Sequence, residues 1–531
     1  MCEQHKRLTI MKRLLLLTFA GLSAMYSNAQ TTWSEHTAEI FFDNCVVCHR
    51  PDGIGPFSLL DYSTADIYKV LIKAEVEANN MPPYKADTSF QHYFDEKILT
   101  PLERNTIINW VNEGGLEGDP ALAPPAPVFT GEKILPGTPD LSITMPNYMS
   151  KATVVQDDYV CISMPTGLTE ERRVRAIEIV PGNSATVHHC LVYYDEDGDY
   201  PTDTIGGDCG GPSSEPLMAG YTPGTRPTVF PANDDFSCGM VMGAGSNVVF
   251  AMHYPHGSYG TWDATTVNFY FYDEPMTTTF RQVYAAPLNA EFDFTIPAGT
   301  IDTLYNTFDD TPFDFTFLSV FPHMHLLGSH MQSFAVTPAS DTVKFVRIPH
   351  YDFDWQDFYW FQYLQYVPAG SDIESRAIYD NTAGNTHNPY DPPQDISEGF
   401  NTTDEMYLIY YHFMAYQSGD ELINQDELIT EFLSTEMAKY NEESEIKVYP
   451  NPFNSSTTIT FDAGENALTS VYIYDLNGRV VNKLVENQYL TGQQEILWDG
   501  SNKIGEEATN GIYFYSMTIN GAAYNGRILK Q

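Results

Sequence analysis

The sequence predicts a mainly β protein with a short helical region near its N-terminus. Residues 141 to about 417, and again 447–531, contain short apolar segments of alternating pattern separated by turn residues, which is typical of β-sandwiches. Residues 63–79 and 102–111 instead carry apolar side chains at helical spacing. The 531 residues, 43% of them hydrophobic, suffice for about three or four domains with packed cores.

The composition is strongly acidic. Asp and Glu number 70 and Lys and Arg number 27, so the formal net charge is −43. Such a surface repels nucleic acid and anionic lipid head groups. We therefore expect no nucleic-acid partner, and we favour a soluble exported protein whose copies are kept apart by like charge.

Residues 1–29 have the pattern of a secretory signal peptide. Met11-Lys12-Arg13 precedes an apolar run of eleven residues over 14–24, and Ser27-Asn28-Ala29 offers a small residue for cleavage before Gln30. The run is too short to span a bilayer, so we expect an exported protein that does not span the membrane. Met11 is a second candidate start.

Cys45-Val46-Val47-Cys48-His49 is a Cys-x-x-Cys-His motif. Two thiols at this spacing can bond the vinyl groups of a haem while His49 ligates its iron. Met81 follows a predicted helix and is the candidate second axial ligand, with core packing as its alternative. A redox or zinc Cys-x-x-Cys is the alternative for the whole motif. These residues resemble the small cytochrome c domains fused to secreted enzymes, which predicts covalently attached haem c within residues 30–119.

Two connecting segments and four cysteines complete the outline of the central region. Residues 120–139 are Pro-rich and predict a semi-rigid linker, and residues 419–446 predict an acidic linker. In an oxidising compartment the remaining cysteines of the exported chain suggest two disulfides with three alternative pairings. They are Cys161, Cys190, Cys209 and Cys238.

Histidines occur in clusters that are typical of a metal site. Alternate residues of an extended segment face the same side, so His323 and His325 form half a site. Neighbouring residues on a strand face opposite ways, so His188 and His189 reach one metal only at a bulge or a strand end. Further candidate ligands, each more often a core residue when taken alone, are His253 and Met406. Histidine with methionine suits copper, because thioether sulfur is a soft ligand.

The order of these residues resembles that of the copper type II monooxygenases, the family of peptidylglycine α-hydroxylating and dopamine β-monooxygenases. The resemblance rests on Asp157-Asp158-Tyr159-Val160-Cys161, His188-His189, His253-Tyr254, His323-Met324-His325 and Asp404-Glu405-Met406. It implies two tandem jelly-roll lobes, over 140–278 and 279–418, which hold two copper ions. It also implies that Cys161 pairs with Cys209, which leaves Cys190 to pair with Cys238.

The resemblance assigns roles to the candidate ligands. It implies that one copper, which supplies electrons, is held by His188, His189 and His253. It implies that the copper that binds dioxygen is held by His323, His325 and Met406, with Tyr410 retained beside it. Ascorbate is the usual reductant of the family.

Two departures from the family bear on the substrate. Phe321 stands where the peptide-hydroxylating member has an arginine that holds the peptide carboxylate, and Leu408 stands where it has an asparagine. Without the guanidinium group, bidentate recognition of a carboxylate is lost. We therefore expect a hydrophobic or aromatic small molecule near Phe321, Leu408 and Tyr410, and no glycine-extended peptide.

Residues 447–531 resemble the type A sorting domain of type IX secretion, a small Ig-like sandwich. The resemblance rests on the segments beginning at Glu445, Val471 and Gly511. It implies recognition by the type IX secretion machinery and a secreted or cell-surface location. An adhesive or carbohydrate-binding β-module is the alternative.

The sequence therefore predicts a secreted copper-dependent monooxygenase that hydroxylates a C–H bond with dioxygen. Electrons would come from an ascorbate-like reductant or from the fused haem domain, which we hypothesise supplies the copper of His188, His189 and His253. The alternatives are a surface electron-transfer or copper-binding protein without hydroxylase activity, and a structural adhesin. The His-x-His pair with a methionine favours the enzyme, because an electron carrier has no use for an oxygen site.

Overall fold

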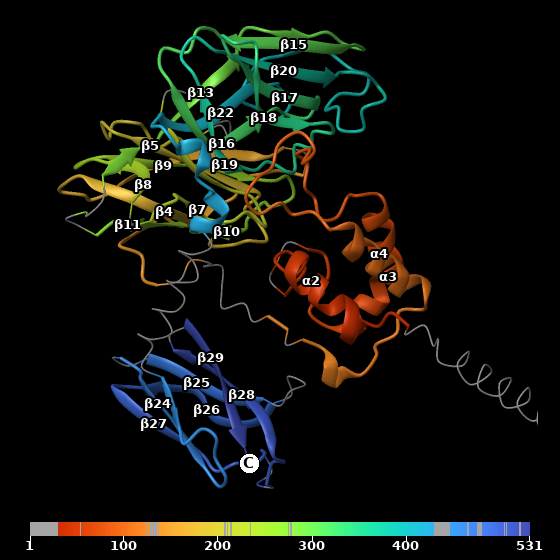
Figure 1. Ribbon diagram of the computed structural model, residues 1–531, viewed down its shortest axis with the longest axis vertical. Helices are drawn as coiled ribbons and strands as arrows, with labels where there is room; N and C mark the ends of the chain where they lie inside the picture. Colours follow the sequence, from red (N-terminus) through yellow and green to blue (C-terminus); the bar gives the residue numbers. More distant parts are fainter. Residues whose placement is uncertain are drawn as a thin grey trace, which may run out of the picture.

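The computed structural model describes residues 30–531, except for 52, 54, 125, 128–134, 136, 155, 206–208, 210, 213–214, 234, 274–275, 277–278, 430–445, 465–466, 475–479, 504, 506, 520–521 and 531. A helical region comes first, two β-sandwich lobes follow, and a further β-sandwich ends the chain (Figure 1). The predicted mainly β class is confirmed. The predicted signal peptide lies outside the described residues, as does the greater part of the linker predicted over 419–446. Within the described chain, no helix combines the length and the apolar character needed to cross a membrane.

The helical region contains η1 (Trp33–Thr37), α2 (Ala38–Asn44), α3 (Tyr62–Glu77), α4 (Pro101–Asn112) and η2 (Pro120–Leu122). The helices predicted over 63–79 and 102–111 are confirmed by α3 and α4. A capping box starts α4, because the Thr100 side chain accepts from the Glu103 amide while the Glu103 carboxylate accepts from the Thr100 amide. Trp110 of α4 is fully buried in the core of this region.

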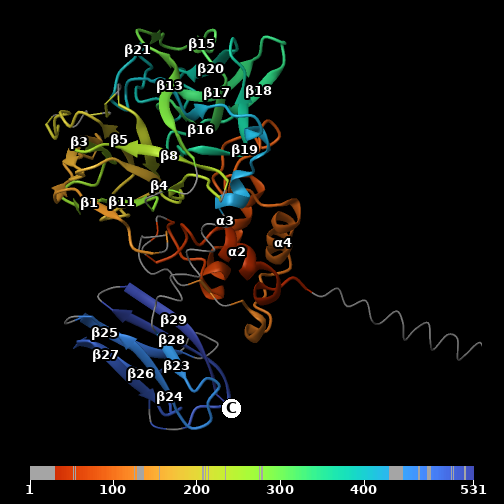
Figure 2. The same ribbon diagram turned by 60° about the vertical axis from the view of Figure 1, so that its left-hand side comes forward.

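Residues 84–97 leave the helical region and lie against the second lobe. Asp87 forms an ion pair with Arg347 at 2.6 Å. Lys85 forms another with Asp352 at 2.8 Å. These contacts fasten the helical region beside the lobes, where both views place it (Figures 1 and 2).

The first lobe packs two sheets around one core. One sheet contains, in order, β1 (Leu141–Thr144), β11 (Thr266–Phe271), β4 (Arg172–Val180), β8 (Ser237–Met242) and β12 (Phe280–Gln282), with β7 (Thr228–Val229) beside β4. The other contains β3 (Asp158–Pro165), β9 (Asn247–Tyr254), β5 (His189–Asp195) and β6 (Leu217–Tyr221). A short pair is formed by β2 (Tyr148–Met149) and β10 (Trp262–Asp263). Phe250 of β9 and Phe269 of β11 are fully buried between the sheets.

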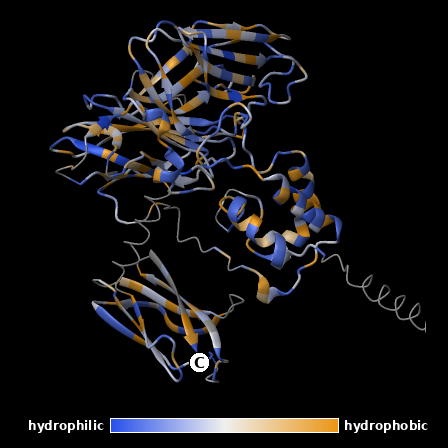
Figure 3. Cartoon of the chain, in the orientation of Figure 1, coloured by the Kyte–Doolittle hydropathy of each residue, from blue (hydrophilic) through white to orange (hydrophobic). Residues whose placement is uncertain are grey.

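The second lobe repeats the two-sheet plan. One sheet contains β13 (Tyr284–Glu291), β22 (Tyr407–Ala415), β16 (Phe315–His323) and β19 (Tyr359–Val367). The other contains β15 (Ile301–Phe308), β20 (Asp372–Asp380), β17 (Gly328–Val336) and β18 (Thr342–Ile348), and a short pair joins β14 (Thr295–Ile296) to β21 (Ile396–Ser397). Buried and part-buried residues alternate along β20, as period-two strands require, and stripes of opposite hydropathy mark these strands in Figure 3. After β22 the short helix η3 (Asp420–Leu422) packs back onto the lobe.

The C-terminal sandwich has its own core around the fully buried Trp498. One sheet contains β23 (Lys447–Tyr449), β24 (Thr457–Asp462) and β27 (Gln493–Trp498). The other contains β26 (Val480–Leu490), β25 (Ala467–Tyr474), β28 (Gly511–Ile519) and β29 (Ala522–Lys530). The small sandwich predicted for residues 447–531 is therefore present.

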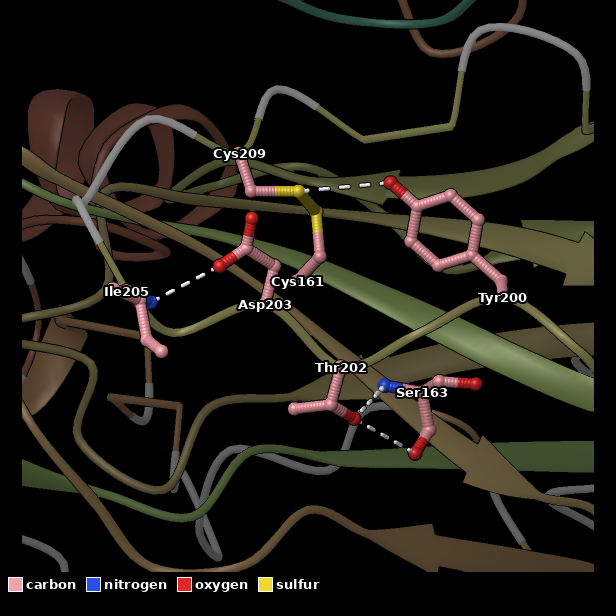
Figure 4. Close-up of a disulfide and its surroundings, with 7 residues drawn as sticks. All are labelled: Cys161, Ser163, Tyr200, Thr202, Asp203, Ile205 and Cys209. Carbon is pink, nitrogen blue, oxygen red and sulfur yellow. Dashed lines mark hydrogen bonds between the residues drawn. A yellow bond between two sulfur atoms is a disulfide. The ribbon is translucent and has the colours of Figure 1, made fainter.

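One of the two predicted disulfides is present. Cys161 of β3 is bonded to Cys209, as predicted (Figure 4). The pairing of Cys190 with Cys238 is wrong, because both are free and buried. They belong to different sheets of the first lobe, Cys190 to β5 and Cys238 to β8. Each thiol contacts a backbone carbonyl near it in the chain instead.

Removing the Cys161–Cys209 bond is expected to destabilise the first lobe. The bond closes a loop of 48 residues, so a Cys161→Ala/Cys209→Ala double variant should lose about 2–4 kcal/mol of unfolding free energy, because the unfolded chain gains freedom. Denaturant unfolding measures the loss, with a reducing agent as the control. Reduction should lower the unfolding free energy of the native protein to that of the variant and leave that of the variant unchanged. Equal stability of the two oxidised proteins would contradict the expectation.

Candidate metal centre

The first histidine cluster lies where β5 and β9 pair. The register of these antiparallel strands sets His189 directly opposite His253. His188 comes immediately before β5, and its amide donates to the carbonyl of His253 at 3.0 Å. His188 and His189 therefore straddle a strand end, which is the arrangement that lets neighbouring histidines face one point.

The Nδ1 atoms of the three rings converge. His253 Nδ1 lies 3.1 Å from Nδ1 of both His188 and His189, and those two atoms are 3.4 Å apart. Burial lowers the pKa of His188 to about 4 and that of His189 well below its ordinary value. Neutral imidazoles whose lone pairs point at one place are the donor set that a metal ion requires. The structure thus brings together all three residues predicted for this site.

Asp157 and Tyr159 support the ring of His253. Nε2 of His253 donates to Asp157 at 3.0 Å, which leaves Nδ1 as the free donor atom of that ring. Burial alone would raise the pKa of Asp157, but hydrogen bonds from His253 and His256 bring it to about 2. Tyr159 stacks on His253 with ring centroids 4.2 Å apart. The ring is therefore held in one orientation from two sides.

The second cluster lies where β16 ends and β22 begins. Their register pairs His323 with Leu408, and continuing it by two residues sets Met406 opposite His325. β16 ends at His323, so His325 stands two residues beyond the strand and just before the turn at 326–327. The two rings still lie beside each other, with centroids 5.1 Å apart and planes at 84°.

Hydrogen bonds select the free nitrogen of each ring in this cluster. Nδ1 of His323 donates to the side-chain oxygen of Gln356 at 2.6 Å. Nδ1 of His325 donates to the carbonyl of Asp404 at 3.1 Å. These oxygens only accept, so Nε2 of each ring remains available to a metal. Burial lowers the pKa of His323 to about 4 and that of His325 to about 3, so both rings are neutral.

Glu405 joins the two chain segments of this cluster. Its carboxylate is fully buried and accepts from the backbone amides of His325 (3.0 Å), Leu327 (2.7 Å) and Met406 (3.3 Å). Burial raises the pKa of Glu405 to about 8, against the lowering effect of these three donors. One side chain therefore sets the spacing between the histidine turn and the methionine.

Both clusters contribute to one cavity of about 560 Å³, which opens to solvent. His189 of the first cluster lines it together with His323, His325 and Met406 of the second. No Lys or Arg is among its described lining residues, so a bidentate carboxylate site is absent there. The other lining groups are largely apolar or aromatic, and include Phe321, Phe353, Phe400, Leu408 and Tyr410.

Phe353 lies between the two clusters. Its ring centroid is 5.7 Å from that of His325, 6.3 Å from that of His253 and 6.5 Å from that of His188. One aromatic ring therefore lies close to histidines of both clusters.

Comparison with protein families agrees with this geometry. Residues 299–431 match the model of the copper type II ascorbate-dependent monooxygenase C-terminal domain. The matched part of the monooxygenase domain contains His323, His325 and Met406. Residues 447–531 match the secretion system C-terminal sorting domain, which indicates export by type IX secretion to the cell surface or beyond.

Solved structures show limited similarity to the chain. It is 24% identical to PorZ, a surface component of the type IX secretion system of Porphyromonas gingivalis, over 17% of this chain and 12% of that one (TM-score 0.14). It is 11% identical to latent PorU from Porphyromonas gingivalis, over 71% of this chain and 34% of that one (TM-score 0.15). At these TM-scores neither likeness bears on function. A search of curated proteins finds no match.

The Cys-x-x-Cys-His residues lie in the helical region, and none of them lines the cavity that the two histidine clusters share. Cys45 and Cys48 are free thiols. Nδ1 of His49 lies 3.1 Å from the carbonyl of Phe57, which leaves Nε2 for a metal. Met81 follows α3 with 40% of its surface exposed, and none of the described contacts joins it to His49. The structure therefore collects three of the four predicted haem residues and leaves Met81 accessible.

Three supporting residues escaped prediction from the sequence. Gln356, Phe353 and Asp157 orient or separate the histidines, but only Asp157 falls within a segment that the family resemblance singles out. Gln356 stands 33 positions from His323, and no local pattern marks a glutamine as the partner of a distant histidine. From the sequence alone, residues 351–358 are indistinguishable from an ordinary loop that is rich in aromatic residues.

Proposed function

We propose that the protein is a secreted copper monooxygenase that hydroxylates a C–H bond of a hydrophobic or aromatic small molecule with dioxygen. The observation that carries the proposal is the shared cavity. Histidines of both clusters and Met406 line one largely apolar space. The family match of residues 299–431 and the sorting domain support the activity and the export respectively.

Each cluster fits one copper ion. His188, His189 and His253 would hold the first through Nδ1, and His323, His325 and Met406 would hold the second through two Nε2 atoms and a thioether. Copper supplies one-electron redox chemistry and activation of dioxygen when it is bound, and thioether ligation favours Cu(I). The protein keeps the imidazoles neutral by burial and aims them through the acceptors described above.

The cavity accounts for the substrate class. Its lining is largely apolar and aromatic, as is usual for sites that bind small hydrophobic molecules. Phe321, Phe353 and Leu408 offer apolar contacts, which would hold a hydrophobic substrate beside the second cluster and displace water from it. Burial raises the pKa of Tyr410 to about 12, so its hydroxyl stays protonated and can donate a hydrogen bond to an oxygen atom in the cavity.

The helical region fits a covalently attached haem c as the internal electron source, with an ascorbate-like molecule as the external one. Both motif thiols are free, and His49 presents Nε2. Phe57 lies against His49 and stacks on Tyr68 of α3, and Leu71, one turn further along, has its apolar side chain exposed. A flat apolar group beside His49 would cover this surface.

Oxygen uptake coupled to product formation tests the proposal. Copper-loaded full-length protein with ascorbate should consume dioxygen and yield a product that carries one more oxygen atom, when it is screened against small aromatic and aliphatic compounds. Metal-free protein and a peptide ending in glycine are the controls, and neither should give product. Copper binding without product from any hydrophobic compound would favour the electron-transfer or copper-binding alternative.

A further inference from the structure

Trp355 lies at the contact between the helical region and the lobes. A Cβ added at Gly224 of the first lobe would be 2.8 Å from Cys48 Sγ and 3.6 Å from Cη2 of Trp355. The backbone at Gly224 has a φ of +89°, which also favours glycine. The bare backbone therefore lets the second cysteine of the motif and the indole ring approach the same point.

Further contacts hold this junction in place. The Lys97 ammonium donates to the carbonyl of Gly224, which ties the 84–97 segment to the same turn. Thr225 closes the turn by donating to the carbonyl of Thr222 from both its amide (2.9 Å) and its hydroxyl (2.8 Å). Cys48 thus packs against a turn of the first lobe that these hydrogen bonds hold in place.

The loop that carries Trp355 also reaches the copper ligands. Gln356 is the next residue, and its side chain accepts the hydrogen bond from His323. Its carbonyl accepts from the Thr222 hydroxyl at 2.9 Å, so the loop is bound to the turn that receives Cys48. The path from Cys48 to His323 therefore crosses the Gly224 turn to the indole of Trp355, follows the chain to the side chain of Gln356, and ends in one hydrogen bond of 2.6 Å.

Cavities follow the same path. A cavity of about 670 Å³, partly open to solvent, is lined by Cys48 and by Gly220 and Thr225 of the first lobe. Gly220 and Thr225 also line a smaller cavity together with Gln356 and His189. Gly220 and Thr225 thus line both the cavity beside Cys48 and the cavity beside His189.

The indole of Trp355 has a feature that packing does not explain. Its Nε1 is buried and has no hydrogen-bond partner among the described residues. An unpaired buried donor is costly, and a phenylalanine would fill the space without that cost. Packing alone therefore does not favour tryptophan over phenylalanine at this place.

Resting on the proposed function, we infer that Trp355 and Gln356 carry electrons from the haem attached at Cys48 to the copper held by His323, His325 and Met406. Each transfer oxidises Fe(II) to Fe(III) and reduces Cu(II) to Cu(I), with one electron moved and no proton. The first electron thus reaches the oxygen-binding side directly, whereas the sequence-based hypothesis sends it to His188, His189 and His253.

Reoxidation of the haem, followed by its absorbance without dioxygen, tests this route. The full-length holoprotein with Cu(II) is reduced rapidly at the haem, and the return of Fe(III) is timed. Trp355→Leu should slow the return by roughly tenfold or more, which corresponds to about 1.4 kcal/mol in the barrier. Gln356→Leu should slow it by about 10- to 100-fold, as loss of a ligand's hydrogen-bond partner does. Trp262→Leu, which removes a tryptophan of the first lobe that is 58% exposed, should leave the rate unchanged.

Two further measurements separate a relay from a structural role. The haem midpoint potential and the copper content should match those of the native protein in Trp355→Leu and in the milder Trp355→Phe. Gly224→Ala should slow reoxidation by pushing Cys48 away, whereas Gly245→Ala, with a φ of +79° and no atom within 4 Å of its added Cβ, should not.

Four results would overturn the inference. A native rate in both Trp355 variants would remove the relay. Fast reoxidation in His323→Ala, together with its loss in His188→Ala, would place electron delivery at the first cluster. A native protein that binds haem and copper but never reoxidises its haem would refute the internal electron source itself. A native protein that lacks copper would instead refute the proposed function, and the route with it.

Discussion

Replacing His325 by alanine is expected to lower the rate of substrate hydroxylation by about 1,000-fold or more. A copper ion contributes several kcal/mol to such chemistry, and each 1.36 kcal/mol is worth a factor of ten. His325 offers one of the two Nε2 atoms of the second cluster, and its amide is fixed by Glu405. Met406→Leu, which keeps the volume but removes the sulfur, should also lose most of the activity. Product formed per minute and copper bound per chain are the measured quantities.

His350 offers a matched control in the same lobe. It is exposed and does not line the cavity, so His350→Ala should keep both the rate and the copper content. A native rate in His325→Ala with copper still bound would mean that dioxygen reacts elsewhere. That result would remove the second cluster from the account and leave the first as the only candidate.

Replacing Asp420 by asparagine is expected to destabilise the junction of the two lobes by about 3–5 kcal/mol, because it leaves the buried Arg281 charge unpaired. Arg281 lies on β12 of the first lobe, and Asp420 lies in η3 behind the second. The guanidinium donates to both carboxylate oxygens, at 2.6 and 2.7 Å, and also to the carbonyl of Ala415. Thr316 donates to the same carboxylate. Denaturant unfolding of the lobes measures the loss.

The pH dependence of this effect has a definite sign. Burial alone would raise the pKa of Asp420, but hydrogen bonds from Arg281, Thr316 and the Gln417 amide hold it below its ordinary value of about 3.9. A carboxyl group with a lowered pKa in the folded state contributes stability that is present above the unfolded pKa and is lost as the pH falls through the folded one. The gap between native protein and Asp420→Asn should therefore be full at pH 7 and shrink below about pH 4.

Glu171→Gln is the control for this carboxylate-to-amide change. Glu171 pairs with Arg173 at 3.6 Å in the first lobe, but its side chain is 59% exposed. Such surface pairs contribute about 0–1 kcal/mol, so little stability should be lost at any pH. An equal loss of unfolding free energy in both variants would show that the buried pair between the lobes stabilises the protein no more than an exposed pair does.

Local patterns in the sequence predict much of this protein. Helical spacing over 63–79 marks α3, and the strand-end requirement of an adjacent histidine pair agrees with the start of β5 at His189. The mainly β class follows from alternation along strands such as β20. These features depend on residues that are close in the chain, where the period of the apolar residues shows which side of a helix or strand is buried.

Contacts between distant segments could not be predicted in the same way. The family resemblance leaves Cys190 to pair with Cys238, yet the two residues belong to different sheets. Gln356 is 134 residues from Thr222, and only the folded chain shows that the loop joins the turn at Gly224 to His323. The same holds for the ion pair of Asp87 with Arg347. These residues are 260 positions apart in the chain, and their pair holds the helical region against the second lobe. Such partners are selected by shape and burial in three dimensions, and no regular spacing in the sequence marks them.

The measurement that tests the central claim most directly is the ligand environment of copper in the full-length protein. X-ray absorption of copper-loaded, ascorbate-reduced protein, with metal analysis, should give two copper ions per chain and a sulfur ligand at one of them. That sulfur signal should vanish in Met406→Leu while both histidine clusters keep their nitrogen ligands. Fewer than two coppers, or a spectrum without sulfur that Met406→Leu does not change, would contradict the account of two copper centres facing one cavity.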